Sequence, residues 1–105
     1  MGAVQEMRRR LATYAELHIE FNEPHFTTQL LLRDGDLRDV ISNLLHPVKL
    51  VHCSTQAGTH GSTKHVLYFQ VSNTRTMVLP VIFDRHGERS IYILTYIMRY
   101  RRWHR

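Results

Sequence analysis

The stretch "DLRDVISNLLHPVKLVHC", residues 36–53, contains the point where the sequence pattern changes from helical to extended. Before Pro47 the apolar residues recur at intervals of three and four, which is typical of an amphipathic helix with one apolar stripe: Leu37, Val40, Ile41, Leu44 and Leu45. From Val48 on, the period falls to two, as it does in strands. Because proline ends helices, the pattern predicts helices before Pro47 and strands after it.

A second amphipathic helix is predicted near the N-terminus. It runs from Val4 to about Leu17, where apolar residues again recur at helical spacing and arginines occupy the other sides. Residues 18–21 then alternate between apolar and polar, which indicates a short extended segment.

A short helix from about Pro24 to Arg33 is predicted between these two. A proline is harmless in a first helical turn, because its missing amide proton would be unpaired there. We expect Asn22 to cap this helix, Gly35 to end it, and Asp36 to cap the helix that follows.

The second half of the chain predicts four strands in an antiparallel sheet. Residues 54–63 form a loop rich in glycine and hydroxyl side chains, whereas 72–75 and 84–88 suit hairpin connections. The predicted strands are Val48–Cys53, His65–Val71, Met77–Phe83 and Ser90–Ile97. Pro80 is unexpected in the third of them, because proline cannot donate to a strand ladder.

The predicted fold is α+β, with two to three N-terminal helices packed on a four-stranded antiparallel sheet. The 105 residues are enough for a single domain, with a helical part at 3–46, the sheet at 48–98 and a basic tail at 99–105. Hydrophobic residues make up 43% and charged residues 22%, a globular composition that does not require a cofactor. Cys53 is the only cysteine, and no apolar run approaches a membrane span, so we expect a cytoplasmic protein that does not bind membranes.

The positive charge is concentrated at the two ends. The formal net charge is +5, and three arginines at 8–10 and four within 99–105 account for the excess. Arginine binds phosphates and carboxylates through two parallel hydrogen bonds, so this placement suggests a polyanion or an acidic protein as partner. Two solubilising tails are the alternative.

The histidines and acids do not predict a metal site. His52, Cys53, His60 and His65 form the densest cluster of potential ligands among the eight histidines and one cysteine. The cluster lacks the closely spaced ligand pair that usually starts a zinc site, and adjacent strand residues point to opposite faces. Carboxylate pairs for magnesium-dependent phosphoryl transfer are also missing.

Metal-free RNA cleavage by the ribose 2′-hydroxyl remains open, because it needs only an acid, a base and cations. We single out His25, at the start of a helix, and His65 as acid or base, with Tyr96 for proton transfer. The candidates for holding phosphate or bases are Arg33, Lys64, Arg75, Thr95, Arg99, Tyr100 and Arg101. His25 as a packing residue, the other candidates as surface charges, and the tail as a partner-binding segment are the alternatives.

The order of these elements resembles the barnase/EndoU/colicin/RelE-like ribonuclease fold, which includes many toxins of bacterial toxin–antitoxin modules. The residues that carry the resemblance are His25, Arg33, the helix "DLRDVISNLLHP" (36–47) and the strand end "ILTYI" (93–97). The resemblance implies a metal-independent endoribonuclease that cleaves mRNA or tRNA, leaves a cyclic phosphate and is inhibited by an antitoxin. Thr95 and Tyr96 are adjacent, so we expect one of them to be structural.

Two other function classes fit the same sequence. One is a non-catalytic module that binds RNA or DNA through its terminal arginines, and the other is a subunit whose arginines bind an acidic protein. Binding driven by phosphates would weaken steeply as salt rises, which separates nucleic acid from most other partners.

Overall fold

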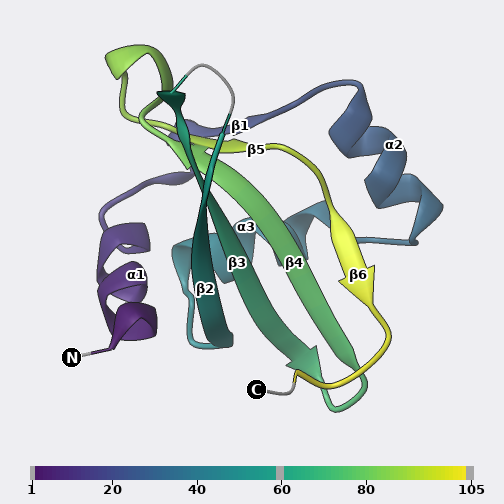
Figure 1. The fold of residues 1–105 in the computed structure, drawn as a ribbon. Coiled ribbons are helices and arrows are strands. Elements are labelled where there is room, and N and C mark those ends of the chain that lie inside the picture. Colours follow the sequence, from purple (N-terminus) through teal and green to yellow (C-terminus); the bar gives the residue numbers. More distant parts are fainter. Residues whose placement is uncertain (1, 59–60, 104–105) are drawn as a thin grey trace.

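The computed structural model describes residues 2–58 and 61–103 and has an α+β fold (Figure 1). The described residues form three α-helices, all in the first half of the chain, and a six-stranded, mostly antiparallel sheet. The α+β class is therefore confirmed, but the sheet has more strands than the four predicted. No helix within the described ranges is long and apolar enough to cross a membrane.

Helix α1 (Ala3–Leu11) is shorter than the pattern predicted. After Leu11 the chain turns, and the hydroxyl of Tyr14 donates a hydrogen bond to Asp84 Oδ1 at 2.7 Å. Leu17, which the helical spacing placed on the apolar stripe, is 83% exposed. The helix therefore ends before Tyr14, whose side chain makes a tertiary contact with Asp84. Leu17 is not part of the helix and does not pack in the core.

One of the N-terminal arginines has a structural role. The Nε of Arg8 donates to the carbonyl of Pro47 at 3.1 Å, and its Nη2 donates to the carbonyl of Leu50 at 2.7 Å. These bonds hold residues 47–50, where the chain passes from helix to strand, against α1. Arg8 therefore contributes to folding and is engaged away from any polyanion.

Helix α2 (His25–Leu32) and helix α3 (Leu37–Leu45) follow each other closely. The cap predicted for α3 is confirmed, because Asp36 Oδ1 accepts a hydrogen bond from the Arg38 amide at 2.9 Å. The cap predicted for α2 is wrong. The Asn22 side chain instead hydrogen-bonds Leu94 and Tyr92. The side chain that accepts an amide hydrogen bond at the start of α2 is that of Glu23.

The sheet has the strand order β1-β5-β4-β3-β2, with β6 also paired to β4. All pairs are antiparallel except β1 with β5. Residues 54–57, predicted to lie in a loop, continue the first long strand, and residues 19–21 of the segment predicted as extended supply the added parallel strand. The strands are β1 (Ile19–Phe21), β2 (Leu50–Ala57), β3 (Thr63–Ser72), β4 (Arg75–Phe83), β5 (Ile91–Ile93) and β6 (Ile97–Arg99).

The last predicted strand, Ser90–Ile97, is divided into β5 and β6 by a bulge. Ile93 pairs with Val81, whereas Ile97 pairs with Val78, so three residues of the last strand lie opposite two residues of β4. Pro80 is one of these two, and its carbonyl accepts from the Leu94 amide at 2.9 Å. Proline has no amide proton to donate, so it fits where the ladder is interrupted.

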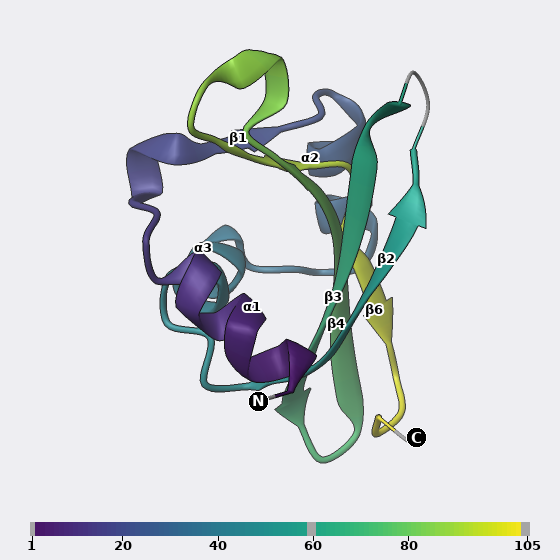
Figure 2. The same ribbon diagram turned by 60° about the vertical axis from the view of Figure 1, so that its left-hand side comes forward.

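The helices pack against one face of the sheet, as Figures 1 and 2 show. The core combines helix residues such as Leu11, Phe26 and Leu44 with alternate residues of the central strands. The strand residues of this core are Leu50, Leu67, Phe69, Met77, Leu79, Val81, Phe83, Ile91 and Ile93. Residues between them in the sequence point to the other face, because strand side chains alternate.

Candidate functional site

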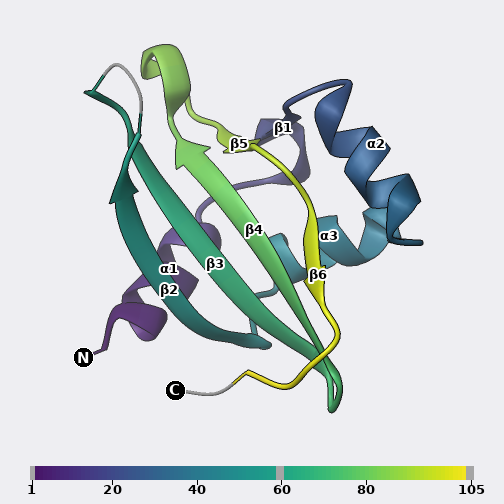
Figure 3. The same ribbon diagram turned by 45° about the vertical axis from the view of Figure 1, so that its right-hand side comes forward.

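The face of the sheet away from α1 and α3, called the open face below, is seen from the front in Figure 3. Strand register places on it a set of mainly polar and aromatic residues: His52, Lys64, Tyr68, Gln70, Thr76, Tyr92, Ile97 and Arg99. Val66 and Val78 lie in its middle and are only 5% and 2% exposed. The longer side chains around them therefore close over the apolar floor of this face.

Three aromatic rings form a cluster on the open face. Trp103 stacks on His52, with ring centroids 4.7 Å apart and planes 17° apart, and its centroid is also 4.7 Å from that of Tyr68. The Trp103 amide donates to Gln70 Oε1 at 2.8 Å. The C-terminal segment is thus attached to the sheet up to Trp103, and the last two residues, His104 and Arg105, lie outside the described part of the chain.

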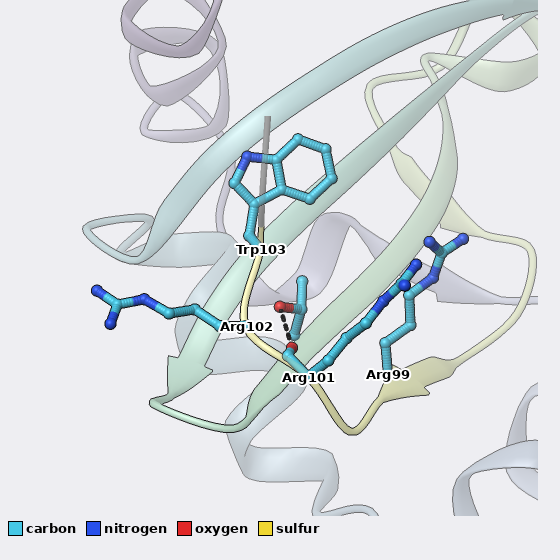
Figure 4. A pocket seen from close by; sticks show the side chains of 5 residues that line it. Arg99, Arg101, Arg102 and Trp103 are labelled. Atoms are coloured by element: carbon cyan, nitrogen blue, oxygen red, sulfur yellow. Dashed lines mark hydrogen bonds between the residues drawn. The ribbon is translucent and has the colours of Figure 1, made fainter.

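Next to this cluster is a small pocket of 230 Å³, called the arginine pocket, which is lined by Thr76, Arg99, Arg101, Arg102 and Trp103. The hydroxyl of Thr76 donates to the Arg101 carbonyl at 2.9 Å and fixes the backbone there. The side chains of Arg99 and Arg101 extend in the same direction in Figure 4, whereas that of Arg102 points away. The pocket lining includes no carboxylate, so its arginines are available to an external anion.

His25, the first residue of α2, and Thr95, in the segment between β5 and β6, are in contact. Figure 3 shows α2 beside this segment. They are 70 positions apart, yet His25 Nε2 and Thr95 Oγ1 are 3.0 Å apart and share a hydrogen bond in an exposed position. The bulge between β5 and β6 produces this contact, because it turns Tyr96 into the core and leaves Thr95 facing α2. A hydroxyl can donate to a neutral ring nitrogen or accept from a protonated one, so Thr95 can serve both states of His25.

The start of α2 is not a free anion site. The Thr27 amide donates to Glu23 Oε1 at 2.8 Å, and the Thr27 hydroxyl donates to Glu23 Oε2. A carboxylate therefore already compensates the positive end of the helix dipole. What His25 presents at this end of α2 is its ring, in contact with Thr95.

Arg33, Arg75, Tyr96 and Tyr100 come together in a separate cleft of 360 Å³. The Arg75 guanidinium lies 5.6 Å from the centroid of the Tyr100 ring. Tyr96 is only 3% exposed, and burial raises the pKa of its phenol, helped by Tyr100 and Asp39. Tyr96 thus fills the core at the wall of this cleft, as expected for one member of the adjacent Thr-Tyr pair.

This cleft suits phosphate less well than the arginine pocket. Besides its two arginines it is lined by three carboxylates, those of Asp34, Asp36 and Asp39. Its formal charge is therefore negative. In addition, Arg33 follows His25 by eight residues along α2, which corresponds to about 12 Å of helix rise. His25 and Arg33 do not form one compact site.

His65 lies in a third place, a hollow of 810 Å³ that Arg10, Arg85, His86 and Asp84 also line. Burial lowers the pKa of the His65 imidazole, and the positive charge of Arg10 lowers it further. Asp84, exposed at the rim, has a pKa held below its usual value mainly by the hydrogen bond from Tyr14. Lys64, next to His65 in sequence, points to the open face, so Lys64 and His65 lie on opposite faces of the sheet.

The sequence candidates are therefore distributed over five places: the His25–Thr95 pair, the arginine pocket, the cleft of Arg33 and Arg75, the His65 hollow and, for Lys64, the open face. Residues that the sequence did not single out complete two of them. His52 and Thr76 join the open face through strand register, and Arg10, Arg85 and His86 complete the hollow. Pairing Tyr68 with His52 across the predicted β-hairpin was the one signal that could have revealed the aromatic cluster.

The potential zinc ligands are separated in the described residues. His52 stacks on Trp103 on the open face, whereas Cys53 packs against the core on the opposite face. Burial raises the pKa of the Cys53 thiol. No group of three His, Cys, Asp or Glu side chains that could hold a metal occurs in the described ranges, and His60 lies outside them.

Comparisons with protein-family models, with curated proteins and with solved structures found no match.

Proposed function

We propose that this protein is a metal-independent endoribonuclease that cleaves RNA by attack of a ribose 2′-hydroxyl on the adjacent phosphorus. The observation that carries the proposal is the contact between His25 and Thr95. The resemblance of the sequence to small ribonucleases selects both residues, and they lie 70 positions apart in the chain. Their meeting in an exposed hydrogen bond, beside a basic open face, is what an acid–base site for a large substrate requires.

In the proposed reaction, His25 takes the proton of the 2′-hydroxyl. The 2′-oxygen then bonds to phosphorus while the bond from phosphorus to the 5′-oxygen breaks, and the leaving 5′-oxygen takes a proton from water, giving a 2′,3′-cyclic phosphate and a 5′-hydroxyl. Thr95 keeps the imidazole oriented before and after it is protonated, because its hydroxyl can accept or donate. Cations near the substrate stabilise the negative charge of the pentacoordinate phosphorus.

The open face is the proposed RNA-binding surface. Its arginine pocket offers guanidinium groups without carboxylates in the lining, and the cluster of His52, Tyr68 and Trp103 offers aromatic surface for unpaired bases. Single-stranded RNA is commonly bound by such combinations of stacking and phosphate contacts. A strand lying on this face would reach the edge at which His25 and Thr95 meet.

The test is cleavage of labelled total tRNA and a synthetic mRNA in EDTA, with His25→Ala and the matched control His46→Ala. His46 is an exposed histidine at the end of α3. We expect discrete EDTA-resistant fragments from the wild type and from His46→Ala, and intact RNA from His25→Ala. Equal fragment yields from the two variants would remove His25 from the site, and fragments lost in EDTA would exclude the metal-free route.

Thr95 provides a second control on the same pair. Thr95→Val removes the hydroxyl and keeps the shape of the side chain, whereas Thr95→Ser keeps the hydroxyl. We expect a loss of kcat in the first variant and near wild-type kcat in the second. The opposite order would mean that the Thr95 methyl group, and not its hydrogen bond, matters.

A second candidate is RNA binding without cleavage, which the carboxylate-free arginine pocket favours by itself. Tight, salt-sensitive binding of intact RNA by the wild type would select this alternative.

We further propose, from the resemblance alone, that cleavage makes the protein a toxin and that an acidic antitoxin masks its arginines. Induced expression in bacteria should arrest growth with the wild type but not with His25→Ala. Growth arrest by both the wild type and His25→Ala would contradict a toxic ribonuclease activity.

A further inference from the structure

The His65 hollow carries features of an anion site that the proposed cleavage step does not use. Its charged lining consists of Arg10, Arg85 and Asp84, which gives a formal charge of +1 with neutral histidines. Two imidazoles, those of His65 and His86, add further potential donors. The hollow therefore suits a phosphate better than a cation.

Two polar atoms in its wall are buried without a hydrogen-bond partner in the described part of the chain. They are His65 Nδ1 and Arg85 Nε. Buried donors without partners are uncommon and destabilising in folded proteins. The Nε–H of arginine is a permanent donor, and Nδ1 of histidine is a donor in one neutral tautomer and in the imidazolium. Both atoms are shielded from solvent, whereas the Arg85 side chain as a whole is 35% exposed, so its outer N–H groups are the ones that a phosphate can reach.

The two arginines of the hollow are positioned by aromatic rings. The Arg85 guanidinium carbon lies 3.5 Å from the centroid of Tyr92, and that of Arg10 lies 4.0 Å from the centroid of Phe83. Stacking of this kind leaves the N–H edge of a guanidinium free for oxygen ligands. Both arginines thus keep a fixed direction while retaining donors for a ligand.

Their ion pairs are too long to occupy these donors fully. Arg85 Nη2 is 3.6 Å from Glu20 Oε1, and Arg10 Nη2 is 3.8 Å from Asp84 Oδ2. Charge-assisted hydrogen bonds are usually about 2.7–2.9 Å. At Arg85 a phosphate can therefore bind without displacing a strong internal partner, whereas Arg10 also hydrogen-bonds the Tyr14 side chain.

The hollow and the His25–Thr95 pair contain consecutive residues of the chain. Leu94 lines it and directly precedes Thr95 in the chain. Asn22 connects the two regions, since its amide donates to the Leu94 carbonyl at 3.2 Å and its Oδ1 accepts from the Tyr92 hydroxyl at 2.9 Å. This connection through the chain and through Asn22 is our reason for assigning the hollow to a neighbouring phosphate of the same polynucleotide.

We infer that the His65 hollow is a phosphate subsite that holds the RNA phosphate next to the one cleaved at the His25–Thr95 pair. The nature of the ligand rests on the proposed function, whereas the binding of phosphate rests on the side chains of the hollow. His65 and Arg85 accordingly bind the substrate beside the cleaved phosphate and do not take part in the bond cleavage.

The first test uses inorganic phosphate and NMR signals of the histidine rings, with the His65 signals assigned by comparison with His65→Gln. We expect saturable shifts of the His65 signals in the wild type and in the control Arg38→Gln, which removes an arginine outside the hollow. Arg85→Gln should abolish them. Phosphate that leaves the His65 ring unperturbed in the wild type would overturn the inference.

The second test measures RNA binding in the non-cleaving His25→Ala background. Adding Arg85→Gln should weaken binding of a short RNA about tenfold, and adding Arg38→Gln should change it little. If phosphate binds but Arg85→Gln leaves RNA affinity unchanged, the hollow is a site for an adventitious ion only and the inference fails. Since neither test requires cleavage, a wild type that binds RNA through Arg85 but never cuts it would contradict only the ribonuclease function.

Discussion

Replacing Gly35 by alanine should destabilise the protein through a steric conflict at the turn between α2 and α3. A Cβ atom at this position would lie 2.5 Å from Leu30 Cδ1 and 2.8 Å from Tyr96 Cζ. Ordinary carbon contacts are about 3.5–4.0 Å, so the nearest atom would have to move by about 1 Å. Leu30 and Tyr96 are 7% and 3% exposed, which leaves little room for either side chain to turn away.

The expected cost is about 1–3 kcal/mol, as for other substitutions that overfill a packed core. For a domain of this size, each kcal/mol lowers the melting temperature by roughly 4–8 °C. Urea and thermal unfolding followed by circular dichroism would measure both quantities. Gly2→Ala is the matched control, because nothing lies within 4 Å of a Cβ atom there.

The same substitution should also impair RNA cleavage, because Tyr96 adjoins Thr95 and any movement of its ring shifts the His25–Thr95 contact. A Gly35→Ala protein as stable as the wild type and the Gly2→Ala control would refute the packing of this turn. A destabilised but fully active variant would refute only the link between the turn and the site.

Three other predictions concern charge and stacking. Since the pKa of Asp84 is lowered on folding, chiefly by Tyr14, its stabilising effect is complete above its usual pKa and decreases as pH falls. Asp84→Asn should therefore flatten the loss of unfolding free energy in acid, and an unchanged pH profile would contradict this. Trp103→Ala should reduce stability by about 1–3 kcal/mol in urea unfolding and weaken RNA binding, and an unaffected RNA affinity would remove the aromatic cluster from the interface. Arg101→Gln should lower the slope of log affinity against log salt by about one, and an unaltered slope would mean that Arg101 contacts no phosphate.

Local sequence signals predicted the elements whose boundaries depend on nearby residues. The helical stripe before Pro47, the Asp36 cap and the turn at 72–75 were visible, because each depends on residues a few positions apart. The number of strands could not be predicted in this way, since β1 is a strand only through its parallel pairing with β5, 72 residues later. Alternation at 18–21 indicated extension but not a partner.

Arrangement of the candidate site depended on tertiary detail. The contact of His25 with Thr95 follows from a bulge opposite Pro80, and no local pattern fixes where a strand gains one residue. Without that residue Thr95 would point into the core, because Ile93 does and strand side chains alternate. Glu23 could have been identified as the likeliest competitor for an anion at α2, since an acid before a helix often caps it.

The most direct test of the account is to identify the 3′ ends of RNA fragments made by the wild-type protein in EDTA, by mass spectrometry. The account predicts 2′,3′-cyclic phosphates, or 3′-phosphates formed from them by hydrolysis, and none of these products with His25→Ala. Fragments that end in a 3′-hydroxyl would contradict attack by the 2′-hydroxyl, and cyclic phosphates produced equally by His25→Ala would contradict the role of the His25–Thr95 pair.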